Sequence, residues 1–302
     1  MKRAYFKLCF ETEVHFGDGT LGETGFSFQA DTLFSALYQE ALKAGEADAF
    51  YQMAAEGDLL FSDAFPYCGK EYYLPKPMYQ IRAEREADPS ERKKYKKLQY
   101  IPTSGWDEYL TGNLQIDRVQ TEFGSFGQRT QASVRSEEGT VPYQIGTFRF
   151  RRDCGLYVIL MYRNDDVYDL MSELMDELLV YSGIGGKRSS GLGKFEVKYG
   201  KEDLFLKSAL EKEGKQNMLL SCALPNEKEA EAAMEDASYL LEKRSGFVAS
   251  ETYADEWRKK KDLYLFRAGS CFPHPFKGNI YDVSNGGNHP VYRYAKGMFL
   301  QI

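Results

Sequence analysis

Hydrophobic and polar residues alternate in the first half of the chain in a way that predicts strands separated by helices. Near the N-terminus, large apolar residues alternate with polar or smaller ones at Phe6, Leu8, Phe10, Val14 and Phe16. This period of two is typical of a long, half-buried strand. A glycine-rich stretch at 17–25 follows, and then a helical pattern that starts with Asp31 as its N-cap and closes at Gly45.

The rest of the first half continues this order of elements. Residues 59–65 and 72–74 read as short strands, and the irregular stretch 101–146 is interpreted as an inserted hairpin or arm. Strand character returns at 148–161, and an amphipathic helix followed by the alternating strand 194–199 completes the unit. The order strand, helix, strand, strand with an insertion, helix, strand is the ferredoxin-like, RRM-like arrangement.

The second half predicts a shorter unit. After a charged linker at 200–216, one helix is expected at 227–241. Strands are expected at 218–224, 247–252, 263–266 and 291–300. We therefore expect an α+β protein with two ferredoxin-like (RRM-like) domains. The first, residues 1–200, carries the arm at about 101–146 and a glycine-rich loop, and the second, residues 201–302, is degenerate.

The glycine-rich loop between the last helix and the last strand of the first domain is the most distinctive motif. Residues 182–195 read SGIGGKRSSGLGKF. Glycine permits sharp turns and close backbone approach, and amides beside Lys187 and Arg188 would suit a phosphodiester chain. The predicted nucleic-acid contacts in this loop are Gly183, Gly185, Gly186, Lys187, Arg188, Ser189, Ser190, Gly191 and Gly193.

Other interpretations of this loop stay open. It is not a nucleotide-triphosphate P-loop, because Leu192 stands where such a loop has its lysine. It is not a dinucleotide fingerprint either, because a helix precedes the glycines instead of following them. A plain flexible turn and a site for a small phosphate ligand remain as alternatives to RNA or DNA binding.

Composition limits the class of protein. The 302 residues suffice for two domains with cores, and 22 Tyr and 20 Phe indicate a globular chain. No apolar stretch is long enough to cross a bilayer, and residues 1–17 show no secretory signal. Five scattered cysteines fit reduced thiols, so we expect a cytoplasmic protein without membrane contact. Cys271 and His274 lack a second ligand pair, so neither a metal site nor a cofactor is expected.

The net charge of −6 argues against nucleic-acid binding, but the distribution of charge argues for it. Basic residues gather at 92–97, 129–152 and 187–188, in stretches predicted to be loops or edges. Acidic residues gather on the predicted helices at 165–177 and 227–242. Such segregation gives an acidic protein a positive surface. Each charged run taken alone is equally compatible with an ordinary solvated face.

Eight segments carry a resemblance to a known family. In chain order they are DTLFSAL (31–37), FSDAFP (61–66), YLPKP (73–77), KKYKKL (93–98), the glycine-rich loop, KRSGF (243–247), GSCF (269–272) and HPVYRY (289–294). On these segments the chain resembles the RAMP superfamily of CRISPR-associated proteins. The finer match is to the fourth Csm-type subunit of type III-A effectors, which caps the 5′ end of the guide RNA. The family usually has Asn-x-Ile-Asp/Asn-Arg after its arm, whereas this chain has QASVR, so only Arg135 carries over there.

The resemblance implies a non-catalytic RNA-binding subunit of a CRISPR effector complex in antiviral defence. Such a subunit holds the repeat-derived 5′ handle of the guide RNA (crRNA). It also joins the large polymerase- or cyclase-like subunit to the filament-forming RAMP backbone subunit. His15, Arg129 and Arg135 then join the glycine-rich loop as predicted RNA contacts. Recognition of a single strand needs cations and amides along the phosphates and surfaces for splayed bases.

The main alternative is an enzyme. Some RAMP relatives cut precursor guide RNA without a metal, and His15, at the end of the first strand, is the candidate acid or base for such an endoribonuclease. A histidine beside Phe16 is more often packed or stacked on RNA. We therefore expect the chain to be catalytically inert.

Other candidate residues have simpler interpretations. Asp31 resembles the acidic residue with which backbone RAMP subunits cut target RNA, but its place at the start of a helix favours a cap. His274 and His289 each lie beside a proline and are expected to be structural. A free-standing RRM regulator of messenger RNA is a third possible class, and the lack of an RNP-type aromatic signature argues against it.

Overall fold

A large antiparallel sheet forms the centre of the computed structural model, which describes residues 1–79, 89–133, 141–200, 204–250 and 252–302. Its strands are β1 (Lys2–Phe10), β4 (Leu59–Phe61), β5 (Phe65–Cys68), β6 (Glu71–Pro75), β7 (Tyr100–Pro102), β10 (Cys154–Tyr162) and β11 (Phe195–Tyr199). They lie in the order β11-β1-β10-β5-β6-β7, and β4 also pairs with β10. The predicted strands around residue 156 and before residue 200 are therefore confirmed. The long strand predicted from Phe6 to Phe16 is shorter, because β1 ends at Phe10 and Val14 forms an isolated bridge with Phe148.

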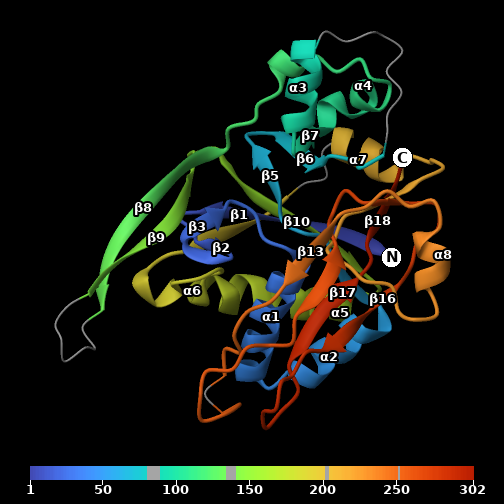
Figure 1. Ribbon diagram of the computed structural model, residues 1–302. Helices are drawn as coiled ribbons and strands as arrows, with labels where there is room; N and C mark the ends of the chain where they lie inside the picture. The colour runs from blue at the N-terminus through green and yellow to red at the C-terminus, as the bar shows by residue number, and fades with distance from the viewer. Residues whose placement is uncertain (80–88, 134–140, 201–203, 251) are drawn as a thin grey trace.

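Helices cover one face of this sheet. They are α1 (Ala30–Ala44), α2 (Ala47–Glu56) and α5 (Asp165–Glu173), and α5 continues through a π-helical turn (Leu174–Leu179) into α6 (Val180–Ser182). Figure 1 shows α1, α2 and α5 together on this side. They bury Phe6 and Leu8 of β1 and Val158 of β10, because alternate residues of a strand face the same side. Gly45 ends α1 in the left-handed conformation, as predicted (φ 81°).

The opposite face of the sheet packs against later parts of the chain. Tyr5, Tyr157 and Ile159 lie in a second core with Trp106 and Leu206. The elements that supply this core include α4 (Trp106–Leu110), α7 (Leu204–Glu211), β12 (Asn217–Leu219) and β18 (Phe299–Gln301). Helix α3 (Pro89–Lys97) lies beside α4 in Figure 1, and 3₁₀ turns occur at Thr103–Gly105 and Ile116–Arg118.

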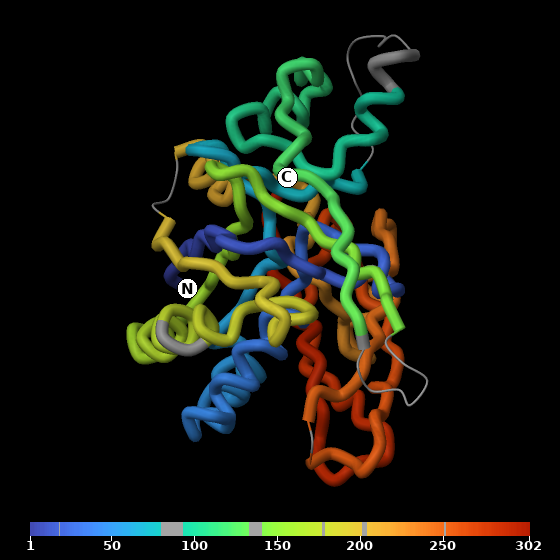
Figure 2. The backbone as a smooth tube through the Cα atoms, turned by 90° about the vertical axis from the view of Figure 1, so that its left-hand side faces the viewer, coloured from blue at the N-terminus to red at the C-terminus, as the bar shows by residue number. Residues whose placement is uncertain are grey.

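Two antiparallel hairpins extend from the first half of the chain. The longer one pairs β8 (Gly124–Ser133) with β9 (Val141–Phe150), and Figures 1 and 2 show it as a long curved arm. The shorter one pairs β2 (Phe16–Asp18) with β3 (Thr20–Gly25) and packs against β9. The predicted arm at 101–146 is thus correct only for its later part, because β7 and α4 bury Ile101, Trp106 and Tyr109 in the core.

The second half forms several small sheets. In the described residues these are β15 (Cys271–Phe272)-β12-β18, β13 (Leu241–Arg244)-β14 (Leu263–Phe266) and β16 (Gly278–Asp282)-β17 (Tyr292–Lys296). The extended segment 219–224 links them, since its amides donate to Ser270, Met298, Phe266 and Ala295. A second four-stranded RRM-like sheet is therefore not confirmed.

Three predictions for the second half are wrong in extent. The charged linker contains α7, because Leu206 and Ala209 are buried against the sheet. The helix expected at 227–241 is reduced to α8 (Ala230–Met234), since Asp236 takes a positive φ of 52° and the chain then enters β13. The strand expected at 247–252 is limited to an isolated bridge between Phe247 and Lys259.

The cysteines also differ from the expectation of five reduced thiols. Cys68 on β5 lies directly opposite Cys154 on β10, and the two are joined in a disulfide with 4.1 Å between their Cα atoms. Cys9, Cys222 and Cys271 are free. The paired cysteines are 86 residues apart in sequence, so only the register of the two strands brings them together.

Candidate nucleic-acid interface

A cleft of about 1350 Å³ lies between the two halves of the chain. Its walls come from the glycine-rich loop, the start of α1, the β2–β3 hairpin, residues 75–78 and the segment 240–245. Eight cationic side chains line it, namely Lys76, Lys96, Arg188, Lys243, Arg244, Lys260, Arg267 and Arg293. Three carboxylates accompany them, namely Asp31, Asp63 and Glu242. The chain as a whole is acidic, yet this cleft is strongly basic.

The glycines of residues 182–195 serve mainly to pack the loop against its neighbours. A Cβ on Gly193 would lie 2.1 Å from the Ile184 carbonyl oxygen, and one on Gly186 would lie 2.7 Å from the His15 ring. The amides of Ile184, Gly186 and Gly193 donate to Gly193, His15 and Glu13 carbonyls, respectively. The sequence predicted that such amides would be open to a phosphate chain, and for these three that prediction is wrong.

The two cations of the loop, Arg188 and Lys187, have different surroundings. Arg188 is half-buried, lines the cleft, and donates to the Gly183 carbonyl (3.4 Å) and to Gln39 Oε1 (3.3 Å). Lys187 takes a left-handed φ of 58°, with its Nζ 4.9 Å from the centre of the Tyr143 ring. Ser189 and Ser190 are exposed on a 3₁₀ turn (Arg188–Ser190).

His15 lies where the loop, the β2–β3 hairpin and the base of the arm meet. Its side chain is only 6% exposed but lines the cleft. Nδ1 lies 2.8 Å from the Gly146 carbonyl oxygen, which can only accept, so Nδ1 carries the proton of the neutral ring. The backbone oxygen of His15 also accepts the Gly186 amide. His15 is therefore held from two sides, an arrangement shared by packed histidines and by catalytic histidines that are oriented through Nδ1.

The two arginines predicted for the arm are not equivalent. Arg129 on β8 pairs with Glu13 (2.5 Å between Nε and Oε2), so its charge is already partly compensated. Arg135 lies outside the described residues. Of the predicted site residues, His15, Gly185, Gly186 and Arg188 line the cleft. Gly183, Lys187, Ser189, Ser190, Gly191 and Gly193 belong to the same loop but are not part of the cleft wall.

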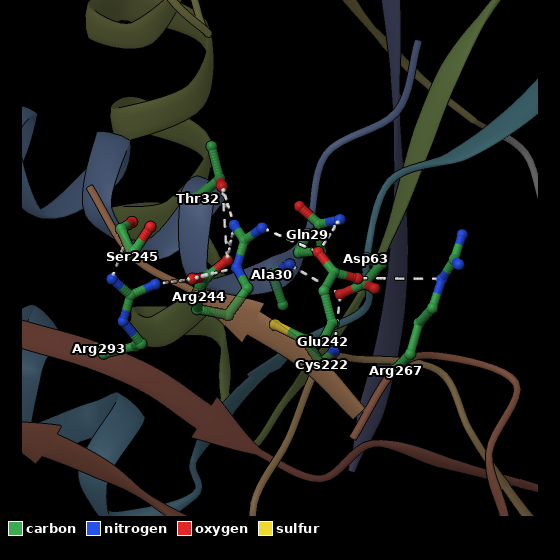
Figure 3. Close-up of polar contacts among 11 residues, drawn as sticks. Gln29, Ala30, Thr32, Asp63, Cys222, Glu242, Arg244, Ser245, Arg267 and Arg293 are labelled. Atoms are coloured by element: carbon green, nitrogen blue, oxygen red, sulfur yellow. Dashed lines mark hydrogen bonds and ion pairs between the residues drawn. The ribbon is translucent and has the colours of Figure 1, made fainter. Parts of the chain in front are cut away.

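A cluster of buried charges joins the two halves at the floor of the cleft (Figure 3). Arg244 and Arg293, from the second half, both bind Asp31 in the first turn of α1. The distances are 2.7 Å to Oδ1 and 2.6 Å to Oδ2. Burial alone would raise the pKa of Asp31, but the two guanidinium groups outweigh it and hold that pKa at about 2.

Asp31 is therefore not the helix cap that the sequence predicted. Gln29 occupies the N-cap position of α1, and Asp31 faces two arginines more than 200 residues away in sequence. The carboxylate next to the helix start is Asp63, whose Oδ1 accepts the amides of Ala30 and Cys222 (2.8 Å each). Burial raises the pKa of Asp63 to about 7 in spite of these two hydrogen bonds.

Several cleft cations lack a carboxylate partner. In the portion of the chain that is described, Lys76, Lys96, Arg188 and Lys260 form no ion pair with an acidic side chain. Burial lowers the pKa of Lys76 and of Lys260, and the neighbouring Arg293 lowers that of Lys260 further. Unpaired cations under mutual repulsion favour an anionic ligand.

Sequence reasoning missed most of these cleft cations. Lys76 and Arg244 lie in the YLPKP and KRSGF segments, and Arg293 lies in HPVYRY, so the family resemblance already marked their surroundings. Lys260 and Arg267 lie outside the segments that carry the family resemblance. Their presence in the cleft depends on how β13 and β14 pack over the start of α1.

The described residues contain one group of candidate metal ligands. One group, Cys68, Asp153 and Cys154, brings its ligand atoms within 4.8 Å of one another, but its two sulfurs form the disulfide. No helix in the described ranges is long and apolar enough to span a membrane.

Comparisons with known proteins add three results. Residues 212–302 match the family model described as the CRISPR Csm4 C-terminal domain. The chain is 36% identical over 306 residues to the protein named CRISPR system Cms protein Csm4 of Mycobacterium tuberculosis (strain CDC 1551 / Oshkosh), covering 100% of this chain and 98% of that one. It is 38% identical over 298 residues to the protein of the same name from Streptococcus thermophilus, covering 96% and 95%.

Two solved structures are also similar to this chain. The crystal structure of the Csm3-Csm4 subcomplex in the type III-A CRISPR-Cas interference complex contains a chain that matches with a TM-score of 0.69 at 16% identity, over 100% of this chain and 99% of that one. The crystal structure of the Csm1-Csm4 cassette in complex with pppApA matches with a TM-score of 0.64 at 18% identity, over 100% and 98%. These likenesses establish the mixed α/β fold.

Proposed function

The chain belongs to the Csm4 family, the Csm-type RAMP subunits of type III CRISPR-Cas effectors, and from that premise we propose that it binds the 5′ handle of the guide RNA. It does so in the basic cleft, as a non-catalytic subunit of a type III-A complex in the cytoplasm. It bridges the large polymerase-like subunit and the RAMP backbone filament. In this way it contributes to antiviral defence without cutting RNA itself.

The excess of cations in the cleft carries this proposal. Eight cationic side chains against three carboxylates would be unfavourable in an empty cleft, and four of those cations lack an acidic partner among the described residues. A single-stranded RNA presents a row of phosphates that such cations can bind. In the glycine-rich loop, Gly185 and Gly186 let the backbone lie directly against His15, which lines the cleft.

The strand order supports the ferredoxin-like interpretation of the first domain. Taking β1, β4/β5, β10 and β11 as its four strands, the observed order is fourth, first, third, second, with α1 and α5 on one face. This is the order expected for two βαβ units in one antiparallel sheet. The division into residues 1–200 and 201–302 and the degenerate RRM-like character of the second part stay predictions.

The names of the similar structures support the proposed partners. One of those structures is a Csm3-Csm4 subcomplex and another is a Csm1-Csm4 cassette. We propose that this chain contacts a backbone subunit of the first kind and a large subunit of the second kind. The arm and the second half offer two separate flanks for them (Figure 2).

The RNA that the protein carries in its native host tests the proposal. The tagged chain is purified together with its bound RNA, which is then sequenced. We expect guides that share one short 5′ end. Random messenger fragments would contradict handle binding and favour the free-standing RRM regulator.

The enzymatic alternative has its own test. Purified protein is incubated with labelled repeat RNA for hours, with and without divalent ions, and we expect the RNA to stay intact. Cleavage that is lost in His15→Ala would overturn the proposal and favour an endoribonuclease. The bond between His15 Nδ1 and the Gly146 carbonyl fits either interpretation, so the cleavage assay decides between them.

A further inference from the structure

An exposed phenyl ring from the arm lines the basic cleft. Phe126 lies on β8 near the base of the arm, in the Gly-Ser-Phe-Gly sequence at 124–127. Its side chain is 64% exposed, and it lines the cleft. Exposing so large an apolar group is unfavourable in water, so a ligand that covers it would be stabilised.

Other aromatic rings hold Phe126 in place from below. It packs edge-on against Phe148, its cross-strand partner, with 4.8 Å between ring centres. Phe148 is 3% exposed and packs on Phe26 (5.3 Å), which in turn packs on Tyr100 (5.8 Å). Phe126 is thus the exposed end of a row of contacting rings, in which Phe148 is buried and Phe26 and Tyr100 are half-buried. These contacts restrict its orientation before any ligand binds.

The residues around Phe126 leave its ring accessible. The residue two positions earlier, on the same face of β8, is Gly124, which has no side chain. A Cβ there would lie 2.1 Å from the Arg149 carbonyl oxygen and 2.7 Å from the Phe148 ring, so the glycine is needed for the close approach to β9 and for the aromatic contact. The adjacent cross-strand pairs are Ser125 with Arg149 and Gly127 with Thr147.

This environment favours a nucleobase over a protein surface. A protein interface would be centred on a contiguous apolar patch. The residues paired next to Phe126 on the arm are polar or small, and the other large, strongly exposed apolar side chains of the cleft, Leu240 and Leu241, come from the second half. The same cleft carries eight cationic side chains. Cations for phosphates together with a fixed aromatic face for a base are the combination with which proteins hold single-stranded nucleic acid.

We propose that Phe126 is a stacking platform for one unpaired base of the RNA that occupies the cleft. This inference rests on the proposed function and adds to it a base contact that is independent of phosphate charge. The stack tolerates any base, because every base has a π face.

Binding of a handle RNA oligonucleotide to the full-length chain across a salt series tests the inference. Phe126→Ala is expected to weaken binding about tenfold, which is the size of one base–aromatic stack. The slope of log affinity against log salt should stay unchanged, because no phosphate contact is lost. Phe126→Trp should keep the affinity, and Phe126→Leu should behave like the alanine variant.

A matched control and a spectroscopic signal separate the possible outcomes. Tyr181 is 83% exposed and is not part of the cleft wall, so Tyr181→Ala should bind like the unmodified chain. With 2-aminopurine placed at successive handle positions, binding should quench one position strongly, and Phe126→Ala should remove that quenching. Equal affinity and equal quenching in Phe126→Ala would overturn the inference while leaving the proposed function intact. Absence of RNA binding by the unmodified chain would instead contradict the proposed function.

Discussion

At the scale of single residues, the cleft distinguishes cations that are already paired from cations that are not. Arg244 and Arg293 neutralise Asp31, whereas Arg188 contacts only the neutral Gln39 side chain and the Gly183 carbonyl. Paired arginines stabilise the fold, and unpaired ones are free to bind a ligand. The same residue type therefore serves two purposes within one cleft.

Replacing the two loop cations tests their part in RNA binding. Lys187→Ala combined with Arg188→Ala should weaken handle binding and lower the salt slope by about 1.4, taking ~0.7 for each phosphate contact on a single strand. The fold should persist, because neither side chain is fully buried. Binding is measured across a salt series, with circular dichroism as the folding control.

A second pair of lysines provides the comparison. Lys215 and Lys228 are exposed and lie away from the cleft wall, so their double alanine variant should keep the slope. If the loop variant keeps full affinity and slope as well, the glycine-rich loop is only a turn.

Asp63 should make the stability of the protein depend on pH. Its pKa is about 7 in the folded chain, above the usual value of 3.8, so the folded state holds a proton between those values that the unfolded state has lost. Its contribution is therefore full below pH 3.8 and is lost as pH rises toward 7. Asp31, with a pKa of about 2, stays ionised over this range.

Asp63→Asn isolates this effect. The asparagine Oδ1 can accept the same two amide hydrogen bonds without ionising. The stability of the variant relative to the unmodified chain should therefore rise by roughly 2 kcal/mol between pH 5 and pH 8. Urea unfolding at both pH values measures it, and a constant difference would show that Asp63 does not titrate there.

At the scale of elements, the glycine-rich loop is held by hydrogen bonds between its own ends and to neighbouring segments. Its ends are joined by the bond from the Ile184 amide to the Gly193 carbonyl (3.0 Å), and Ile184 and Leu192 are buried. Gly191 and Gly193 distinguish two reasons why a loop position requires glycine, namely a left-handed backbone and close approach to another backbone. Both have a positive φ, 76° for Gly193 and 82° for Gly191, but only Gly193 is in close contact with another backbone.

Alanine at each glycine should distinguish close approach from backbone conformation. Gly191→Ala has open space and should cost only the left-handed strain, about 1–2 kcal/mol. Gly193→Ala adds an overlap with the Ile184 carbonyl and should cost a further ~1–3 kcal/mol. Denaturant unfolding of the two variants gives the comparison. Equal costs would mean that the loop can move away from Ile184.

At the scale of the whole molecule, the two halves share apolar cores and are also joined by buried ion pairs. Asp31 binds Arg244 and Arg293, and Asp63 accepts the Cys222 amide, so the start of α1 is fixed to the second half at several points (Figure 3). The cleft lies directly above this junction and takes its shape from it. Its ligand site therefore requires both halves.

Removing the charge of Asp31 should weaken this junction strongly. Asp31→Asn leaves the buried Arg293 without its carboxylate partner and Arg244 paired with Glu242, and should cost about 3–5 kcal/mol in urea unfolding. Asp165 forms an exposed ion pair with Lys2, so Asp165→Asn should destabilise the fold much less. A loss for Asp31→Asn no larger than for this control would show that the arginines do not depend on the carboxylate.

The sequence by itself determined the features that depend on neighbours along the chain. The alternation around Phe6 and Leu8, the closure of α1 at Gly45 and the position of the glycine-rich loop could all be predicted, because period and turn chemistry are local. Resemblance of short segments to the Csm subunits added the family. Of the predicted RNA contacts, His15, Gly185, Gly186 and Arg188 line the cleft, and their contact with RNA stays a prediction.

Only the tertiary structure decided which of these groups are free to act. Asp31 looked like a cap until folding placed Arg293 beside it, 262 residues later in sequence, and the loop amides looked open until His15 and Glu13 accepted them. Folding also brings Cys68 and Cys154 together in a disulfide and places Lys260 in the cleft. Partners that are distant in sequence are chosen by sheet register and packing, which leave no periodic signal in the chain.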